Sequence, residues 1–278
     1  GGEVDLATQV STDSGDVIIT GDSVDQHVNI DIDGTVTVTA NTGSIVMEGG
    51  TVTTSDGNTI TYTASDSVSL GQLDAGTGNV NVTASNGSIE EVTNDTTVNI
   101  IANTATLNAA TGIGNSSILD TTVTTLSATN STSGNIDIRE SDELIISGSG
   151  VSTSAGNGNI NIDVDAGTLT LNSGVAANGS GTVTLNADSG TVDINAAVSS
   201  TSGAIDVDGN AVTQDANIST SGQVTVDASS GSITMADGSI TGGSIIEYTA
   251  TENVALSILN STASVAVTAD SDVNNTGA

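Results

Sequence analysis

Apolar and polar residues alternate in short runs along most of the chain. Val36-Thr37-Val38-Thr39 has an apolar side chain at every second position, and residues 80–83 repeat the pattern. Successive side chains of a strand point to opposite faces, so this period of two predicts strands with one buried and one solvated face. The pattern predicts further strands over residues 17–19, 28–32, 59–63, 97–101, 136–138, 144–146, 160–164, 169–171, 183–185, 192–194, 205–207, 224–226 and 265–267.

A glycine-closed motif links these strands. Residues 34–45 read Gly-x-Val-x-Val-x-Ala-x-x-Gly-x-Ile, and the motif returns at Gly78, Gly181 and Gly222, with a looser copy from Gly158. The copies recur at near multiples of one short interval, which is typical of one turn, or rung, of a β-solenoid. We therefore expect an all-β fold, a right-handed parallel β-helix with about 20–22 residues per rung and roughly 13 rungs. The Ala- and Leu-containing stretch 100–114 also fits strand, corner and strand better than helix, because Thr, Asn and Gly interrupt it.

A longer repeat lies over the short one. When residues 2–53 are moved forward by 188 positions, 23 of the 52 aligned residues are identical without a gap. Both methionines (Met47 and Met235) fall in phase, and so do both tyrosines (Tyr62 and Tyr248) after a deletion of two residues. This register predicts one complete repeat unit at 2–189 and the start of the next unit at 190–278, continuous with the first in one rod.

Composition and charge exclude several classes of function. The core must consist of Val, Ile, Leu and Ala, because the chain has no Trp, Phe, Pro or Cys. With 33 acidic residues against one arginine and no lysine, the formal net charge is −32. A basic footprint for nucleic acid is missing, anionic membranes would repel the chain, and no apolar run is long enough for membrane insertion.

Three Asp-x-Asp pairs are the candidate metal ligands. They are Asp31 and Asp33, Asp163 and Asp165, and Asp206 and Asp208. Alternation places both carboxylates of a pair on one wet face, where oxygen-rich sites can hold Ca²⁺. Diffuse cation association and a solvated acidic face that prevents lateral aggregation are the alternatives. No cofactor is required, and Ca²⁺ is an optional ligand.

Catalytic chemistry is weakly represented. His27 has Asp215 at the equivalent place in the next unit, so the repeat does not require an imidazole. Paired carboxylates can hydrolyse glycosidic bonds, so a β-helix enzyme acting on polysaccharides remains an alternative. We nevertheless expect that the protein is not an enzyme. Thr35 to Thr39 and Thr59 to Thr63 are similar to ice-binding solenoids, but many rungs carry Asn or Asp where such proteins repeat threonine.

The pattern over residues 102–114, continued over 119–130 and 133–138, resembles giant bacterial β-strand-repeat surface proteins of the filamentous-haemagglutinin-like adhesin and autotransporter-passenger type. The resemblance implies a structural or adhesive shaft or filament, extracellular at a bacterial cell surface. The alternatives are a Ca²⁺-stabilised carbohydrate-binding adhesin and the polysaccharide-active enzyme. Expected partners are surface glycans and, end to end, further repeats or identical chains, because residues 190–278 begin a new copy and neither end carries a recognisable cap.

Overall fold

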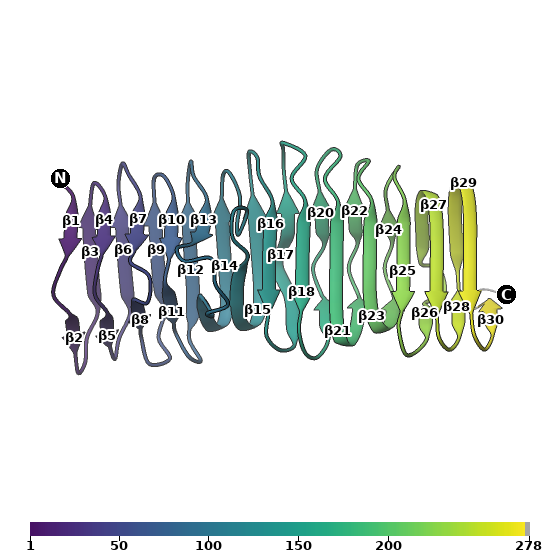
Figure 1. Ribbon diagram of the computed structural model, residues 1–278, viewed down its shortest axis with the longest axis horizontal. Helices are drawn as coiled ribbons and strands as arrows, with labels where there is room; N and C mark the ends of the chain where they lie inside the picture. The colour runs from purple at the N-terminus through teal and green to yellow at the C-terminus, as the bar shows by residue number, and fades with distance from the viewer. Residues whose placement is uncertain (276–278) are drawn as a thin grey trace. The chain divides into compact units, whose positions relative to one another are not determined.

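The computed structural model describes residues 1–275 and is an all-β solenoid of about 13 turns (Figure 1). Parallel strands stack rung upon rung, which confirms the predicted fold class. The chain divides into two compact units, which do not coincide with the sequence repeats. We call residues 1–139 unit 1 and residues 140–278 unit 2. Residues 1–275 contain no helix suited to crossing a membrane.

In unit 1 each rung contributes a strand to three parallel ladders. The first ladder contains β1 (Val4–Leu6), β4 (Val24–Gln26), β7 (Ile45–Met47), β10 (Val68–Leu70) and β13 (Ile89–Glu91), and bridges at Ile113 extend it to β16 (Ile136–Glu140). The second contains β2 (Val10–Thr12), β5 (Ile30–Ile32), β8 (Val52–Thr54), β11 (Gln72–Asp74) and the first parts of β14 (Ile100–Ala109) and β15 (Leu119–Asn130). The third contains β3 (Val17–Gly21), β6 (Val36–Ala40), β9 (Ile60–Ala64), β12 (Asn79–Ala84) and the remainders of β14 and β15.

Unit 2 repeats this arrangement. Its first ladder runs through β17 (Leu144–Thr153), β19 (Leu169–Leu171), β21 (Val183–Ile194), β23 (Ile205–Gln214), β26 (Ile233–Met235), β28 (Val254–Leu256) and β30 (Val273–Asn275). The second runs through β17, β20 (Val175–Ala177), β22 (Val198–Ser200), β24 (Ile218–Ser219), β27 (Ile240–Ala250) and β29 (Ile258–Ala269). The third joins β18 (Ile160–Val164), β21, β23, β25 (Val224–Ala228), β27 and β29.

The rung length varies more than the motif spacing indicated. Val17 pairs with Val36, whereas Val80 pairs with Ala105, so the second rung is the longer of the two. The extra residues lie between the paired strand segments, where they leave the ladder register unchanged. The corners therefore absorb insertions, while the inward positions stay stacked at a nearly constant spacing.

Small aliphatic side chains fill the interior. Val36, Ile60 and Val80 are consecutive neighbours in the third ladder of unit 1, and all three are fully buried. Each such layer needs side chains of similar volume, because the layers above and below have the same width. This explains why a chain with two aromatic residues builds a continuous core.

The motif glycines follow from the close approach of neighbouring corners. A Cβ added to Gly203 would collide with the carbonyl oxygen of Gly181, and one added to Gly181 would collide with that of Gly158. Backbone from the next rung occupies the space that a side chain would need. The recurring glycine in the sequence therefore marks corners that stack directly on one another.

The strand predicted over residues 97–101 begins later than expected. Residues 97–99 are irregular, and β14 begins at Ile100. Side chains here form hydrogen bonds with backbone groups that would otherwise pair with a neighbouring strand. The Asp95 carboxylate accepts a hydrogen bond from the Thr97 amide, and the Gln72 side chain donates one to the Val98 carbonyl. Side-chain hydrogen bonds therefore replace strand pairing at Thr97 and Val98.

A closed polar ring lies inside the apolar core of unit 1. Gln26 Nε2 donates to Thr53 Oγ1 at 3.0 Å, and Tyr62 Oη donates to Gln26 Oε1 at 2.7 Å. The Thr53 and Tyr62 hydroxyls lie 2.8 Å apart and complete the ring, while the second hydrogen on Gln26 Nε2 goes to the Val28 carbonyl. All three side chains are fully buried, so the ring satisfies polar groups that water cannot reach.

The same ring recurs in unit 2. It consists of Gln214, Thr241 and Tyr248, with Gln214 Nε2 to Thr241 Oγ1 at 2.9 Å and Tyr248 Oη to Gln214 Oε1 at 2.6 Å. Glutamine and threonine lie 188 positions after their counterparts (26 to 214, 53 to 241), and tyrosine lies 186 positions after its own. The long sequence repeat thus includes a complete buried hydrogen-bond network.

Candidate functional site

The predicted aspartate pairs lie on the outside of the solenoid, within strands or directly after them. Asp31 is in β5 and Asp33 follows it, and both are exposed. Asp163 is in β18 and Asp165 follows it, while Asp206 and Asp208 are both in β23. The expectation that each pair shares a wet face agrees with these positions. Metal binding itself stays a prediction.

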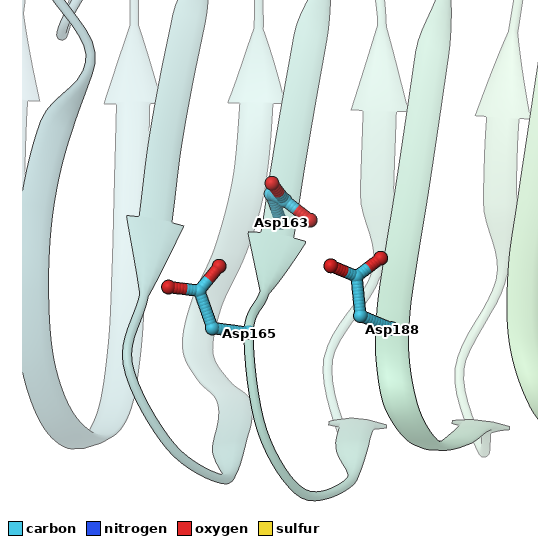
Figure 2. A group of neighbouring side chains, drawn as sticks. All are labelled: Asp163, Asp165 and Asp188. Carbon is cyan, nitrogen blue, oxygen red and sulfur yellow. The ribbon is translucent and has the colours of Figure 1, made fainter.

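In unit 2 the second pair gains a third carboxylate from the next rung. Asp163, Asp165 and Asp188 each offer one oxygen, and these oxygens lie within 4.8 Å of one another. Figure 2 shows Asp163 and Asp165 at the end of β18 and Asp188 on the adjoining strand. The register of β21 shifts between Ala187 and Thr191, and Asp188 lies within this irregularity. Such an irregularity re-aims a side chain, here beside β18.

Asn186 connects the carboxylates of this cluster. Its Nδ2 donates to Asp163 Oδ1 at 2.8 Å and to Asp188 Oδ1 at 2.7 Å. The amide therefore holds one oxygen of each carboxylate and fixes the orientation of both groups. Three carboxylates supply the hard oxygen ligands that Ca²⁺ prefers, so the donor set fits that ion.

The acidic surface continues along the third ladder of unit 2. Asn186 pairs with Asp208, and Asp208 pairs with Asp227, in successive strands. A hollow of about 340 Å³ lies against Asp188, Asp208 and Asp227. We call the six carboxylates Asp163, Asp165, Asp188, Asp206, Asp208 and Asp227 the acidic strip.

Partial burial and, after it, crowding of like charges perturb the acidic strip. Partial burial, followed by repulsion from Asp206 and then Asp227, raises the pKa of Asp208 to about 6. Partial burial and then Asp227 also raise the pKa of Asp206. Both shifts mean that the fold disfavours the ionised carboxylates, so a bound cation would relieve a repulsion already present in the fold.

The first aspartate pair has a different setting in unit 1. Asp31 and Asp33 line a hollow of about 330 Å³ together with Asp13 and Asp56. Asp31 Oδ1 accepts a hydrogen bond from Thr54 Oγ1 at 2.7 Å, so one of its oxygens has a neutral partner.

His27 is on the surface. Its Nδ1 lies 3.3 Å from Glu48 Oε2 and its Nε2 lies 3.7 Å from Asp5 Oδ1. The imidazole thus bridges carboxylates of neighbouring rungs.

Sequence reasoning missed Asp188, Asp227 and Asn186. The strip is built on rung steps of unequal length, because position 163 pairs with 186, 186 with 208, and 208 with 227. No single period brings these residues into line. Alignment of the strands by their Val and Ile positions, one by one, would have placed them side by side.

Comparisons with known proteins add no relative. No protein-family profile matches the chain, and neither the curated proteins nor the solved structures contain a match. The repeated rings and the acidic strip therefore carry the functional argument.

Proposed function

We propose that this chain is a structural or adhesive β-solenoid segment, part of an extracellular shaft or filament at a bacterial cell surface, without catalysis. One observation carries the proposal, namely that the 188-residue repeat preserves the interior while the surface changes. The buried ring of Gln26, Thr53 and Tyr62 has an identical counterpart. Exposed Asp31 and Asp33, in contrast, correspond to Ser219 and Ser221. A repeat that preserves its buried residues but changes its exposed ones is typical of a structural scaffold. A binding or catalytic site common to both copies would need the same exposed residues in each.

The open edge of unit 1 supports partners that continue the ladders. Val4, Val10 and Val17 are only half-buried, whereas their ladder neighbours Val24, Ile30 and Val36 are fully buried. Another rung on this side would bury the same positions and pair the free backbone edge of β1 to β3. Further repeats or a second copy of the chain would supply such a rung.

A Ca²⁺-stabilised adhesin for neutral glycans is the second candidate. The cluster of Asp163, Asp165 and Asp188 favours it, because three carboxylates converge there and the fold already disfavours the ionised form of Asp208 in the same strip. Ca²⁺ bound there would stiffen the surface of unit 2. Without Ca²⁺ binding, the inert shaft is the better description.

Surface labelling, the shape and secondary structure of the particle, and an activity assay test the main proposal. Antibodies against the chain should label intact cells of the source bacterium without permeabilisation, and labelling only after lysis would contradict the surface location. Small-angle scattering of the purified chain should give an elongated particle with a β-rich circular dichroism spectrum. Turnover of neutral or acidic polysaccharides by the purified chain, abolished by mutation of the acidic strip, would assign it to the enzymes instead.

A further inference from the structure

One strand ladder of unit 1 presents an uncharged outer face in a strongly acidic protein. The outward positions of β3, β6, β9, β12 and β14 bear hydroxyl, amide or methyl groups only. We call these ten residues the threonine face: Ile18, Thr20, Thr37, Thr39, Thr61, Thr63, Asn81, Thr83, Thr106 and Asn108. The corresponding ladder of unit 2 carries Asp163, Asp206, Asp208 and Asp227.

The threonine face is a two-dimensional lattice. Thr37 pairs with Thr61 and Thr61 with Asn81, and one column further along Thr39 pairs with Thr63 and Thr63 with Thr83. Neighbouring rungs of a sheet lie about 4.8 Å apart, and alternate residues of a strand about 6.7 Å apart. Figure 1 shows β6, β9 and β12 side by side in unit 1. The side chains therefore repeat in both directions at fixed spacings.

The lattice is rigid for two reasons. Strands β6, β9 and β12 have fully buried inner faces, with Val38, Tyr62 and Val82 directly behind the threonines. Threonine is β-branched, so its hydroxyl and methyl groups have few alternative positions on a strand. Most of the outward side chains are also half-buried against their neighbours. A partner that binds them finds groups already in place.

These properties define the chemistry of the partner. The partner must be uncharged, because the threonine face offers no counter-charge. It must also be periodic in two dimensions, because the side chains of the face repeat in two directions. Polysaccharide crystals meet both conditions, but sugar rings normally stack on exposed aromatic side chains. The chain's two tyrosines are 0% and 1% exposed, and it has no Trp or Phe. Crystalline water needs no aromatic platform.

We propose that the threonine face of unit 1 binds ice. Its hydroxyl and amide groups hold water at lattice positions, and its methyl groups, with Ile18 at 75% exposure beside Thr37, order the water between them. The absence of carboxylates matters because charged groups hold a hydration shell that does not fit a crystal. The sequence argued against this activity because Asn and Asp interrupt the threonines, but on this ladder all the interruptions are neutral.

The test uses the full chain and an ice surface. A fluorescently labelled chain should concentrate in a slowly growing ice crystal and slow its growth, unlike a labelled inert protein of similar size. Thr61→Lys and Thr83→Lys should each lose most of this enrichment. Thr234→Lys should keep it, because Thr234 is an exposed strand residue of the first ladder of unit 2 between Thr213 and Ala255. Melting curves of all three variants check that the fold is intact.

Three outcomes would overturn the proposal. They are exclusion of the wild-type chain from ice, equal loss in Thr61→Lys and Thr234→Lys, and retained enrichment in a folded Thr61→Lys variant. Binding to microcrystalline cellulose or chitin that Thr61→Lys abolishes, with no ice enrichment, would assign the face to polysaccharide. This inference is independent of the proposed shaft function, because a shaft without an ice-binding face would still label intact cells.

Discussion

The Tyr62 hydroxyl donates a 2.7 Å hydrogen bond to Oε1 of Gln26, which lies 36 residues earlier in the chain. This bond crosses the core and links β4 in the first ladder to β9 in the third ladder. It also explains why glutamine faces inward at a position where the motif would allow an aliphatic residue. A fully satisfied ring of this kind fixes the register of the rungs around it.

Tyr62→Phe should destabilise unit 1 by about 1–3 kcal/mol, because Gln26 Oε1 loses its donor in a dry interior. Tyr248→Phe should have a similar effect on unit 2, and the two losses should add because the rings share no residue. Urea unfolding monitored by circular dichroism measures both. Thr63→Ala, which truncates an outward neighbour of Tyr62, should change stability much less, and equal losses would contradict a special role for the ring.

Gly203→Ala should destabilise the fold by about 2–4 kcal/mol, because the new methyl group meets backbone of the neighbouring rung. Gly242→Ala is the matched control, since nothing lies within 4 Å of a Cβ at that position. Thermal melting of the two variants should separate them clearly. Similar melting temperatures would mean that the stacked corners leave room for a methyl group at Gly203.

The ion pair of Arg139 and Asp120 should be sensitive to loss of either partner. Arg139 Nη2 lies 2.6 Å from Asp120 Oδ1, and the aspartate side chain is 5% exposed. Arg139→Gln should destabilise unit 1 by about 3–5 kcal/mol, because it leaves a buried negative charge without its counter-charge. The double variant Arg139→Gln with Asp120→Asn should recover part of the loss. A double variant as unstable as the sum of both singles would contradict this reading.

The pH dependence of stability should depend on Asp208. Its folded pKa of about 6 is above the ordinary value of 3.8, so the folded state binds this proton more tightly than the unfolded state. Asp208 therefore contributes stability at low pH that is lost as the pH rises from about 4 to about 6. Asp208→Asn should gain about 1 kcal/mol or less near neutral pH, after allowance for solvent screening, and nothing below the ordinary pKa. Urea unfolding at both pH values measures this. A gain of equal size in acid would contradict the electrostatic cause.

Calcium should raise the melting temperature of the wild-type chain relative to the same sample with chelator. At a concentration about 100 times the dissociation constant, a single site contributes about 2.7 kcal/mol. Asp188→Asn should remove most of the shift, because it takes one of three carboxylates from the cluster. Asp31→Asn in unit 1 is the comparison, and it should leave the shift from this cluster unchanged. A shift that survives Asp188→Asn would point to diffuse cation association.

The sequence pattern is enough to predict the all-β solenoid, its approximate number of rungs and the inward faces of most strands. Alternation of Val or Ile with Thr, Asn or Asp specifies buried and exposed faces locally, and the glycine motif specifies the corners. The long repeat also aligns Gln26 with Gln214 and, after a deletion of two residues, Tyr62 with Tyr248.

Which outward residues become neighbours depends on the folded arrangement of the rungs. The unequal rung steps, such as Val17 to Val36 against Val80 to Ala105, depend on how each corner accommodates its extra residues, and no local pattern encodes that choice. For this reason Asp188 joined Asp163 and Asp165, Thr53 joined Gln26 and Tyr62, and uncharged residues gathered on one ladder of unit 1. Position along a strand is a local property, whereas position across the strands is set by the packing of whole rungs.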